Sequence, residues 1–124
     1  MAHAFLLQDW TTVSGAAGGT VKQGEDRYLD LSGYQDVALY LEVGTSTPTG
    51  LTVDIETSPI KEDAYFDGMH SFASIAAGLQ PLGVVRWASA SVPLARFVRW
   101  KITAASAWSI TFRIWINANQ AGGR

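Results

Sequence analysis

The sequence contains no cysteine, which excludes disulfide scaffolds, thiolate metal sites and cysteine nucleophiles together. It also lacks any apolar run near the roughly 20 residues that a membrane-spanning helix needs. The N-terminal stretch Met1–Leu7 has no lysine or arginine and is too short an apolar segment for a signal peptide. We therefore expect no membrane partner and a chain that is made in the cytoplasm.

Acidic residues are missing from the second part of the chain. All eleven Asp and Glu residues lie between Asp9 and Asp67 together with three of the nine basic residues, and the other six basic residues follow in a stretch without any acid. Such asymmetry can indicate a nucleic-acid or membrane partner. It also arises when acidic strands pair with basic strands in one sheet, which is the interpretation we favour. Because the basic residues are few and the net charge is −2, we do not expect a nucleic-acid binder.

What the sequence does contain is apolar alternation with a period of two, which predicts strands that bury one face. It is clearest in four segments: 37–43, 51–56, 96–103 and 109–117. Weaker strands are predicted at 5–12, 20–23, 27–30, 70–76 and 83–90. The stretch 110–116 is so apolar and β-branched that an open edge there would invite aggregation, so we expect this strand to be central or covered by a partner.

These strands and the turn residues between them predict an all-β fold, an antiparallel β-sandwich of about eight strands. A jelly roll is the first choice. An immunoglobulin-like Greek key is the second, because its Cys…Trp…Cys pattern is missing. One segment departs from alternation: Ser58 is a candidate N-cap before a proline and several acids, which predicts a short helical turn over 59–67. Its apolar residues Ile60, Ala64 and Tyr65 are expected to lie on the sandwich.

The chain has 124 residues, the size of one ordinary domain, and neither a repeat nor a linker divides it. We expect residues 1–124 to form a single β-sandwich domain with flexible N-terminal residues and a frayed C-terminal tail at 118–124. Loops are predicted where small residues, Gly and Pro gather, at 13–20, 45–50 and 76–83.

Few residues offer themselves for catalysis. The two histidines, His3 and His70, lie in no recognised nucleophile motif, and each is interpreted as a surface or strand-edge residue. Asp54 and Glu56 share one strand face, as the paired carboxylates of a glycosidase could, but cross-strand ion pairing explains them more simply. We therefore expect neither enzymatic activity nor a cofactor.

A second group of carboxylates, Glu62, Asp63 and Asp67, lies in the predicted helical turn. Oxygen ligands could suggest calcium, but the spacing differs from that of the Asp-x-Asp-x-Asp-Gly loop. Acids in the first turn of a helix are already favoured by the helix dipole. We predict no metal site here.

Five tryptophans are many for this length. Trp100 shares a face with apolar neighbours and is expected in the core, whereas Trp115 shares a face with Arg113 and is expected outside. Trp108 stands in a predicted turn. An exposed Trp beside Arg is typical of protein interfaces and would also suit sugar stacking. It equally fits an indole that lies flat on its own sheet in a cation–π pair.

Four segments in this order resemble the small β-sandwich virion proteins of tailed bacteriophages. The pattern is a long strand, a strand ending in Thr-Ser-Pro, a strand of Arg-x-Val-Arg type and a closing strand, found at Tyr28–Val43, Leu51–Pro59, Ala95–Ile102 and Ile110–Ile116. The resemblance covers most of the chain from Tyr28 to Asn117. It implies a head-decoration, head-fibre or tail component, and it carries over no functional residue.

The sequence thus predicts a structural protein of the phage virion. We expect a subunit that is made in the host cytoplasm, self-associates, and decorates or stabilises the capsid surface through contacts with other virion subunits. The alternative is a carbohydrate-binding module with exposed tryptophans. The candidate interface residues form an acidic set and a basic, aromatic set: Asp54, Glu56, Glu62, Asp63 and Asp67 in the first, and Arg99, Lys101, Arg113, Trp115 and Trp108 in the second.

Overall fold

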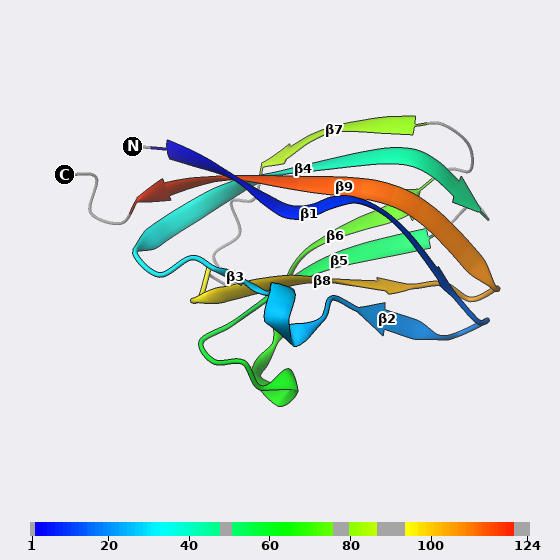
Figure 1. Ribbon diagram of the computed structural model, residues 1–124, viewed down its shortest axis with the longest axis horizontal. Helices are drawn as coiled ribbons and strands as arrows, with labels where there is room; N and C mark the ends of the chain where they lie inside the picture. The colour runs from blue at the N-terminus through cyan, green and yellow to red at the C-terminus, as the bar shows by residue number, and fades with distance from the viewer. Residues whose placement is uncertain (1, 48–50, 76–79, 87–93, 121–124) are drawn as a thin grey trace.

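The computed structural model describes residues 2–47, 51–75, 80–86 and 94–120, and it shows two β-sheets stacked face to face (Figure 1). Two 3₁₀ turns are the helical elements of these ranges, η1 (Glu25–Arg27) and η2 (Asp63–Tyr65). The strands are β1 (Ala2–Gly15), β2 (Thr20–Lys22), β3 (Leu29–Asp30), β4 (Tyr34–Thr47), β5 (Leu51–Ser58), β6 (Asp67–Ile75), β7 (Gln80–Arg86), β8 (Phe97–Thr103) and β9 (Trp108–Gln120). The predicted all-β sandwich is confirmed.

The strand order is that of a jelly roll. The four-stranded sheet runs β1-β9-β4-β7, and the five-stranded sheet runs β2-β8-β5-β6, with the short β3 beside β8. Every strand pairing is antiparallel. Once β3 is set aside, consecutive strands alternate between the two sheets except at the β5–β6 hairpin, which is the double Greek-key path of the jelly roll.

The core lies between the sheets and follows from the alternation in the sequence. On β9, four inward side chains have no exposed surface: Ile110, Phe112, Ile114 and Ile116. The Phe112 ring meets the Trp100 ring of β8 edge to face, with centroids 5.2 Å apart and planes at 87°. Trp100 therefore belongs to the core, as predicted, and its indole joins the two sheets. The apolar strand β9 is central in its sheet, also as predicted.

Strand order also explains the uneven charge along the chain. The two late strands β8 and β9 are each inserted between strands of the first half, β9 between β1 and β4, and β8 between β2 and β5. Acidic early strands thereby come into register with basic late ones, as Glu42 does with Arg113, and Glu56 with Arg99. Opposite charges directly across a ladder attract one another. The charge split therefore reflects pairing inside each sheet.

The helical turn expected over 59–67 is present as the single 3₁₀ turn η2, but it does not begin at Ser58. The ladder between β5 and β8 continues to Ser58, which pairs with Phe97, so the backbone is extended where an N-cap was predicted. The Ser58 hydroxyl instead donates to the Ile60 carbonyl, 2.6 Å away. Only the single turn η2 remains. Ile60 and Tyr65 are 42% and 56% exposed, and the apolar residue that this loop buries is Phe66.

Several strands are longer than predicted. β1 begins at Ala2, which pairs with Asn119, so the N-terminal residues expected to be flexible belong to the sheet. The tail was predicted to fray from 118, yet β9 continues to Gln120. Strand residues also occupy parts of all three predicted loops, since β1 extends to Gly15, β4 to Thr47, and β7 begins at Gln80. The remainder of the latter two loops, 48–50 and 76–79, lies outside the described residues.

Trp108 is not in an exposed turn. It is the first residue of β9, pairs with Gly15, and is only 3% exposed. A Cβ atom on Gly15 would lie 2.6 Å from the indole ring, so the ring occupies the space that any other residue would fill. Trp108 is a core residue and is removed from the candidate interface.

Candidate interaction surfaces

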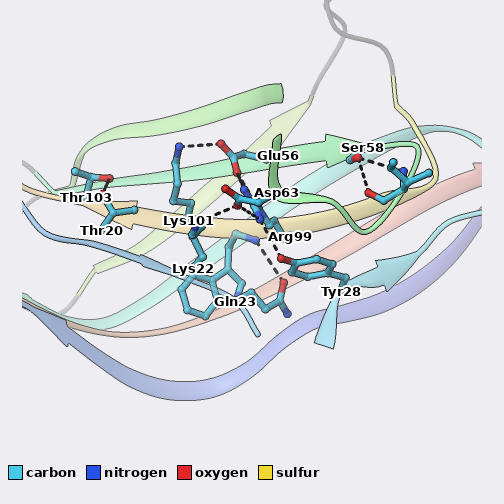
Figure 2. A network of polar contacts seen from close by, with 12 residues as sticks. Thr20, Lys22, Gln23, Tyr28, Glu56, Ser58, Asp63, Arg99, Lys101 and Thr103 are labelled. Carbon is cyan, nitrogen blue, oxygen red and sulfur yellow. Dashed lines mark hydrogen bonds and ion pairs between the residues drawn. The ribbon is translucent and has the colours of Figure 1, made fainter. Parts of the chain in front are cut away.

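Arg99 is the centre of a polar cluster on the outer face of the five-stranded sheet (Figure 2). Its Nε donates to Glu56 Oε1 over 2.9 Å. Its Nη1 donates to the Tyr28 hydroxyl at 2.9 Å and lies 2.8 Å from Asp63 Oδ1. Lys101 Nζ lies 2.9 Å from the other oxygen of Glu56. The cluster thus brings together two residues of the acidic candidate set and two of the basic set. The sequence had suggested that these two sets form separate surfaces.

Aromatic rings cover this cluster and remove Arg99 from water. The Arg99 guanidinium carbon lies 3.9 Å from the centre of the Phe66 ring and 5.7 Å from that of Tyr28. Arg99 is only 3% exposed, so this candidate interface residue is not available on the surface. The Arg99 side chain points to the outer face of the sheet, as alternation predicts, but the loop after β5 folds over it.

The electrostatics of the cluster favour its charged form. Burial acts to lower the pKa of Arg99, but hydrogen bonds to Tyr28, Glu56 and Asp63 outweigh it and hold that pKa above the usual value. The pKa of Asp63 is lowered, first by the hydrogen bond from Lys22 and then by that from Arg99. Asp63 belongs to η2, so the two cations fasten the loop to β2 and β8.

Beyond its anchor, the same loop presents side chains to solvent. Ile60 and Tyr65 are among the most exposed large apolar residues described. Glu62 and Asp67 are also exposed, and neither forms an ion pair with a described residue. Asp54 lies nearby in register with Lys101. We call Ile60, Glu62, Tyr65 and Asp67 the loop surface.

The outer face of the four-stranded sheet carries the remaining predicted residues. Arg113 donates two parallel hydrogen bonds to Glu42, both 2.9 Å long. Its guanidinium carbon lies 4.9 Å from the ring centre of Trp10 and 5.6 Å from that of Trp115. The cation–π pair, one of the interpretations that the sequence left open for Trp115 and Arg113, is therefore present. The sequence did not identify Trp10 and Glu42 as partners of Arg113, because β1 and β4 become neighbours of Arg113 only through their pairing with β9.

A shallow hollow of about 450 Å³ lies beside Trp115 on this face. Its lining includes the rings of Tyr40 and Trp115, the small residue Ala4, and the polar residues Glu42 and Asn117. Sequence alternation predicted that Trp115 points outward. It could not predict that Tyr40 is a neighbour of Trp115, because that contact depends on the β4–β9 register.

Each of the two histidines packs against an aromatic side chain. His3 Nδ1 lies 2.7 Å from the Tyr34 hydroxyl. The His70 ring packs edge to face on Phe72, with centroids 4.8 Å apart. Burial lowers the pKa of His70, and the charge of Asp54 opposes the shift. Among the described residues, no three His, Cys, Asp or Glu side chains are grouped so that they could hold a metal ion.

Comparison with known proteins relates this chain to others through its fold. No family model matches the sequence, and no curated protein matches it. The structure is similar to that of the PBSX exported protein XepA, with a TM-score of 0.54 and 16% identity over 96% of this chain and 37% of XepA. At this identity, the likeness shows a shared fold, and the chain spans little more than a third of XepA.

Two further structures have lower scores. A structure of infectious bursal disease virus, Gx strain, has a TM-score of 0.48 and 12% identity over 100% of this chain and 33% of that one. The pili described as Bacillus endospore appendages have a TM-score of 0.42 and 20% identity over 96% of this chain and 92% of theirs.

A search of the described residues for a helix with the length and hydropathy of a membrane span finds none.

Proposed function

We propose that the chain is a structural subunit of a phage particle, which attaches to the capsid surface and acts through protein–protein contacts without catalysing a reaction. Two independent features support this role. The strand pattern from Tyr28 to Asn117 resembles small virion proteins of tailed phages. The fold is shared with the PBSX exported protein XepA.

The observation that carries the proposal is the anchored loop between β5 and β6. Asp63 is held by Lys22 and Arg99, and the ring of Phe66 lies over the Arg99 guanidinium. The loop is therefore ordered before any partner arrives, which reduces the entropy lost on binding. It displays Tyr65, one of the residue types that contribute most to interface energies.

The charge on the loop surface indicates what the partner offers. Glu62 and Asp67 are exposed close in sequence to the apolar Ile60 and Tyr65, and they form no ion pair among the residues that the structure describes. An apolar centre with a charged rim is the usual arrangement of a protein interface. We expect the neighbouring subunit to present an apolar depression bordered by Lys or Arg.

The test is co-sedimentation of the purified protein with emptied capsid shells of the phage that encodes it. Wild type should bind the shells, and Tyr65→Ala and Ile60→Ala should each weaken binding about tenfold. Tyr40→Ala is the matched control, since Tyr40 is an exposed tyrosine on the other sheet, and it should bind like wild type.

Light scattering on the same samples completes the test, because the proposed subunit self-associates. A wild-type protein that stays monomeric and remains in the supernatant when the shells sediment would overturn the proposal. Equal binding by Tyr65→Ala, Ile60→Ala and wild type would show that the loop surface is not the contact.

A further inference from the structure

The outer face of the four-stranded sheet has a row of large apolar side chains, two of them aromatic, that the proposed capsid contact does not use. Trp115 on β9 is in register with Leu6 of β1 on one side and with Tyr40 of β4 on the other. Leu6 and Tyr40 are 38% and 36% exposed. Neighbouring strands of a sheet lie about 4.8 Å apart, so the row crosses three strands and forms a continuous apolar strip.

The next row of the same sheet has an alanine on each side of β9, next to the row of large side chains. Asn117, two residues after Trp115, is in register with Ala4 of β1 and Ala38 of β4. Ala4 and Asn117 line the hollow together with Tyr40 and Trp115, and its volume is about 450 Å³. Ligand sites are typically concave and mainly apolar, with a few polar groups that fix orientation.

We infer that this hollow binds a neutral carbohydrate. A sugar ring has a flat face of C–H groups, which suits the exposed faces of Trp115 and Tyr40. It also has hydroxyls around its edge that both donate and accept hydrogen bonds. The Asn117 amide offers two donors and an acceptor, and within the described part of the chain none of them is used.

The charges around the hollow select a neutral ligand. The Glu42 carboxylate lines it, and both carboxylate oxygens already accept hydrogen bonds from Arg113. The pair leaves no net charge for a phosphate or a sulfate to approach. Single-stranded nucleic acid also stacks on aromatic rings, but it needs a positively charged groove along its backbone, and Arg113, the cation beside the hollow, is already paired with Glu42.

The aromatic wall is held in place before a ligand binds. The Arg113 guanidinium lies between the rings of Trp10 and Trp115, at 4.9 Å and 5.6 Å from their centres. Glu42 fixes the guanidinium through two hydrogen bonds. Such ordering lowers the entropy cost of binding. The face therefore has the rigid rings and adjacent hydrogen-bonding groups that sugar recognition requires.

The first experiment probes wild type with a printed array of neutral and acidic oligosaccharides. Affinity electrophoresis through gels containing dextran, galactomannan or mixed-linkage β-glucan follows. We expect retention by a neutral glycan, with a change in tryptophan fluorescence on binding. Tyr40→Ala and Asn117→Ala should each reduce affinity about tenfold, and Trp115→Ala should abolish retention.

Tyr65→Ala is the matched control, because it removes an exposed tyrosine on the other sheet, and its retention should equal that of wild type. Circular dichroism of each variant confirms folding. If Trp115→Ala does not fold, Tyr40→Ala and Asn117→Ala decide the outcome. Folded wild type without any neutral glycan ligand would overturn the inference. So would salt-sensitive binding of an oligothymidylate at the same face, or retention unchanged in Tyr40→Ala and Asn117→Ala. None of these outcomes bears on capsid binding through the loop surface.

Discussion

Glu56 and Arg99 are neighbours across the β5–β8 ladder, and their side chains are only 7% and 4% exposed. They are 43 residues apart in the chain. Removing two charges from water is costly, and the cost is recovered only where further partners saturate both groups. Here Tyr28 and Asp63 bind the guanidinium, and Lys101 binds the carboxylate. Asp63 therefore links the loop after β5 to the buried ion pair of the sheet beneath it.

Replacing Arg99 by methionine should destabilise the fold strongly. The change leaves Glu56 buried with only Lys101 beside it, and the loss of one partner from a buried ion pair typically costs about 3–5 kcal/mol. Urea unfolding of Arg99→Met against wild type measures the difference in the free energy of unfolding.

The double variant Arg99→Met/Glu56→Leu is its control, since it removes both charges. Replacement of a whole buried pair by apolar residues is often close to neutral, so the double variant should recover much of the lost stability. A double variant as unstable as the single one would show that packing, and not the unpaired carboxylate, causes the loss.

Replacing Gly15 by alanine should destabilise the sandwich, because the new Cβ would lie 2.6 Å from the Trp108 ring. That ring is only 3% exposed, and overpacking of this kind costs about 1–3 kcal/mol. Thermal unfolding of Gly68→Ala gives the matched control, since nothing lies within 4 Å of a Cβ at that position. Equal melting temperatures for the two variants would contradict the expectation.

Phe112→Ala should cost about 3–5 kcal/mol, the usual range for deleting a buried phenylalanine. Phe112 has no exposed surface and meets Trp100 of the other sheet edge to face. Chemical denaturation measures the loss, and Phe112→Leu, which keeps most of the volume, should cost much less. If the two substitutions proved equally mild, this ring pair would not be central to the contact between the sheets.

The stability of the protein should fall as the pH drops through the acid range. The hydrogen bond from Arg96, followed by those from Ser32, holds the pKa of Asp30 well below its usual range. An unfolded Asp takes up its proton near pH 3.9, so below that pH the unfolded state binds a proton that the folded state refuses. The stabilisation by Asp30 is therefore present above about pH 4 and is lost as the pH approaches its folded pKa.

Melting temperatures of wild type and Asp30→Asn between about pH 5 and pH 2 test this. The wild-type curve should fall more steeply than that of the variant. Both side chains of the Asp30–Arg96 pair are about half exposed, so roughly 0.5 M salt should reduce the difference. Parallel curves would show that Asp30 does not contribute to the acid sensitivity.

The sequence predicts those features that depend on one strand at a time. Alternation correctly identified the segments of β4, β5, β8 and β9, and it placed Trp100 inside and Arg113 with Trp115 outside. It could not predict that Arg99 is buried, because the covering rings of Tyr28 and Phe66 come from distant segments.

The predicted turn at Trp108 and the predicted helix start at Ser58 are wrong for the same reason. The residues before Trp108 are small and polar, as in a turn, but the burial of its ring depends on Gly15 of β1. Ser58 and the proline after it resemble the start of a helix, yet the pairing of Ser58 with Phe97 keeps the backbone extended. In both cases a partner strand from elsewhere in the chain decides the conformation, and no local pattern identifies that partner.

The central place of β8 and β9 has a consequence for how the protein is made. Both strands lie late in the chain, and each bridges strands of the first half that are not paired with one another. While residues before Phe97 leave the ribosome, β1 and β4 have no strand between them, and the same holds for β2 and β5. Neither sheet can close until β8 and β9 have been synthesised, so the nascent chain must remain soluble with open strand edges until both have left the ribosome. Its folding should accordingly be slow, as expected for a chain whose pairings are mostly distant in sequence.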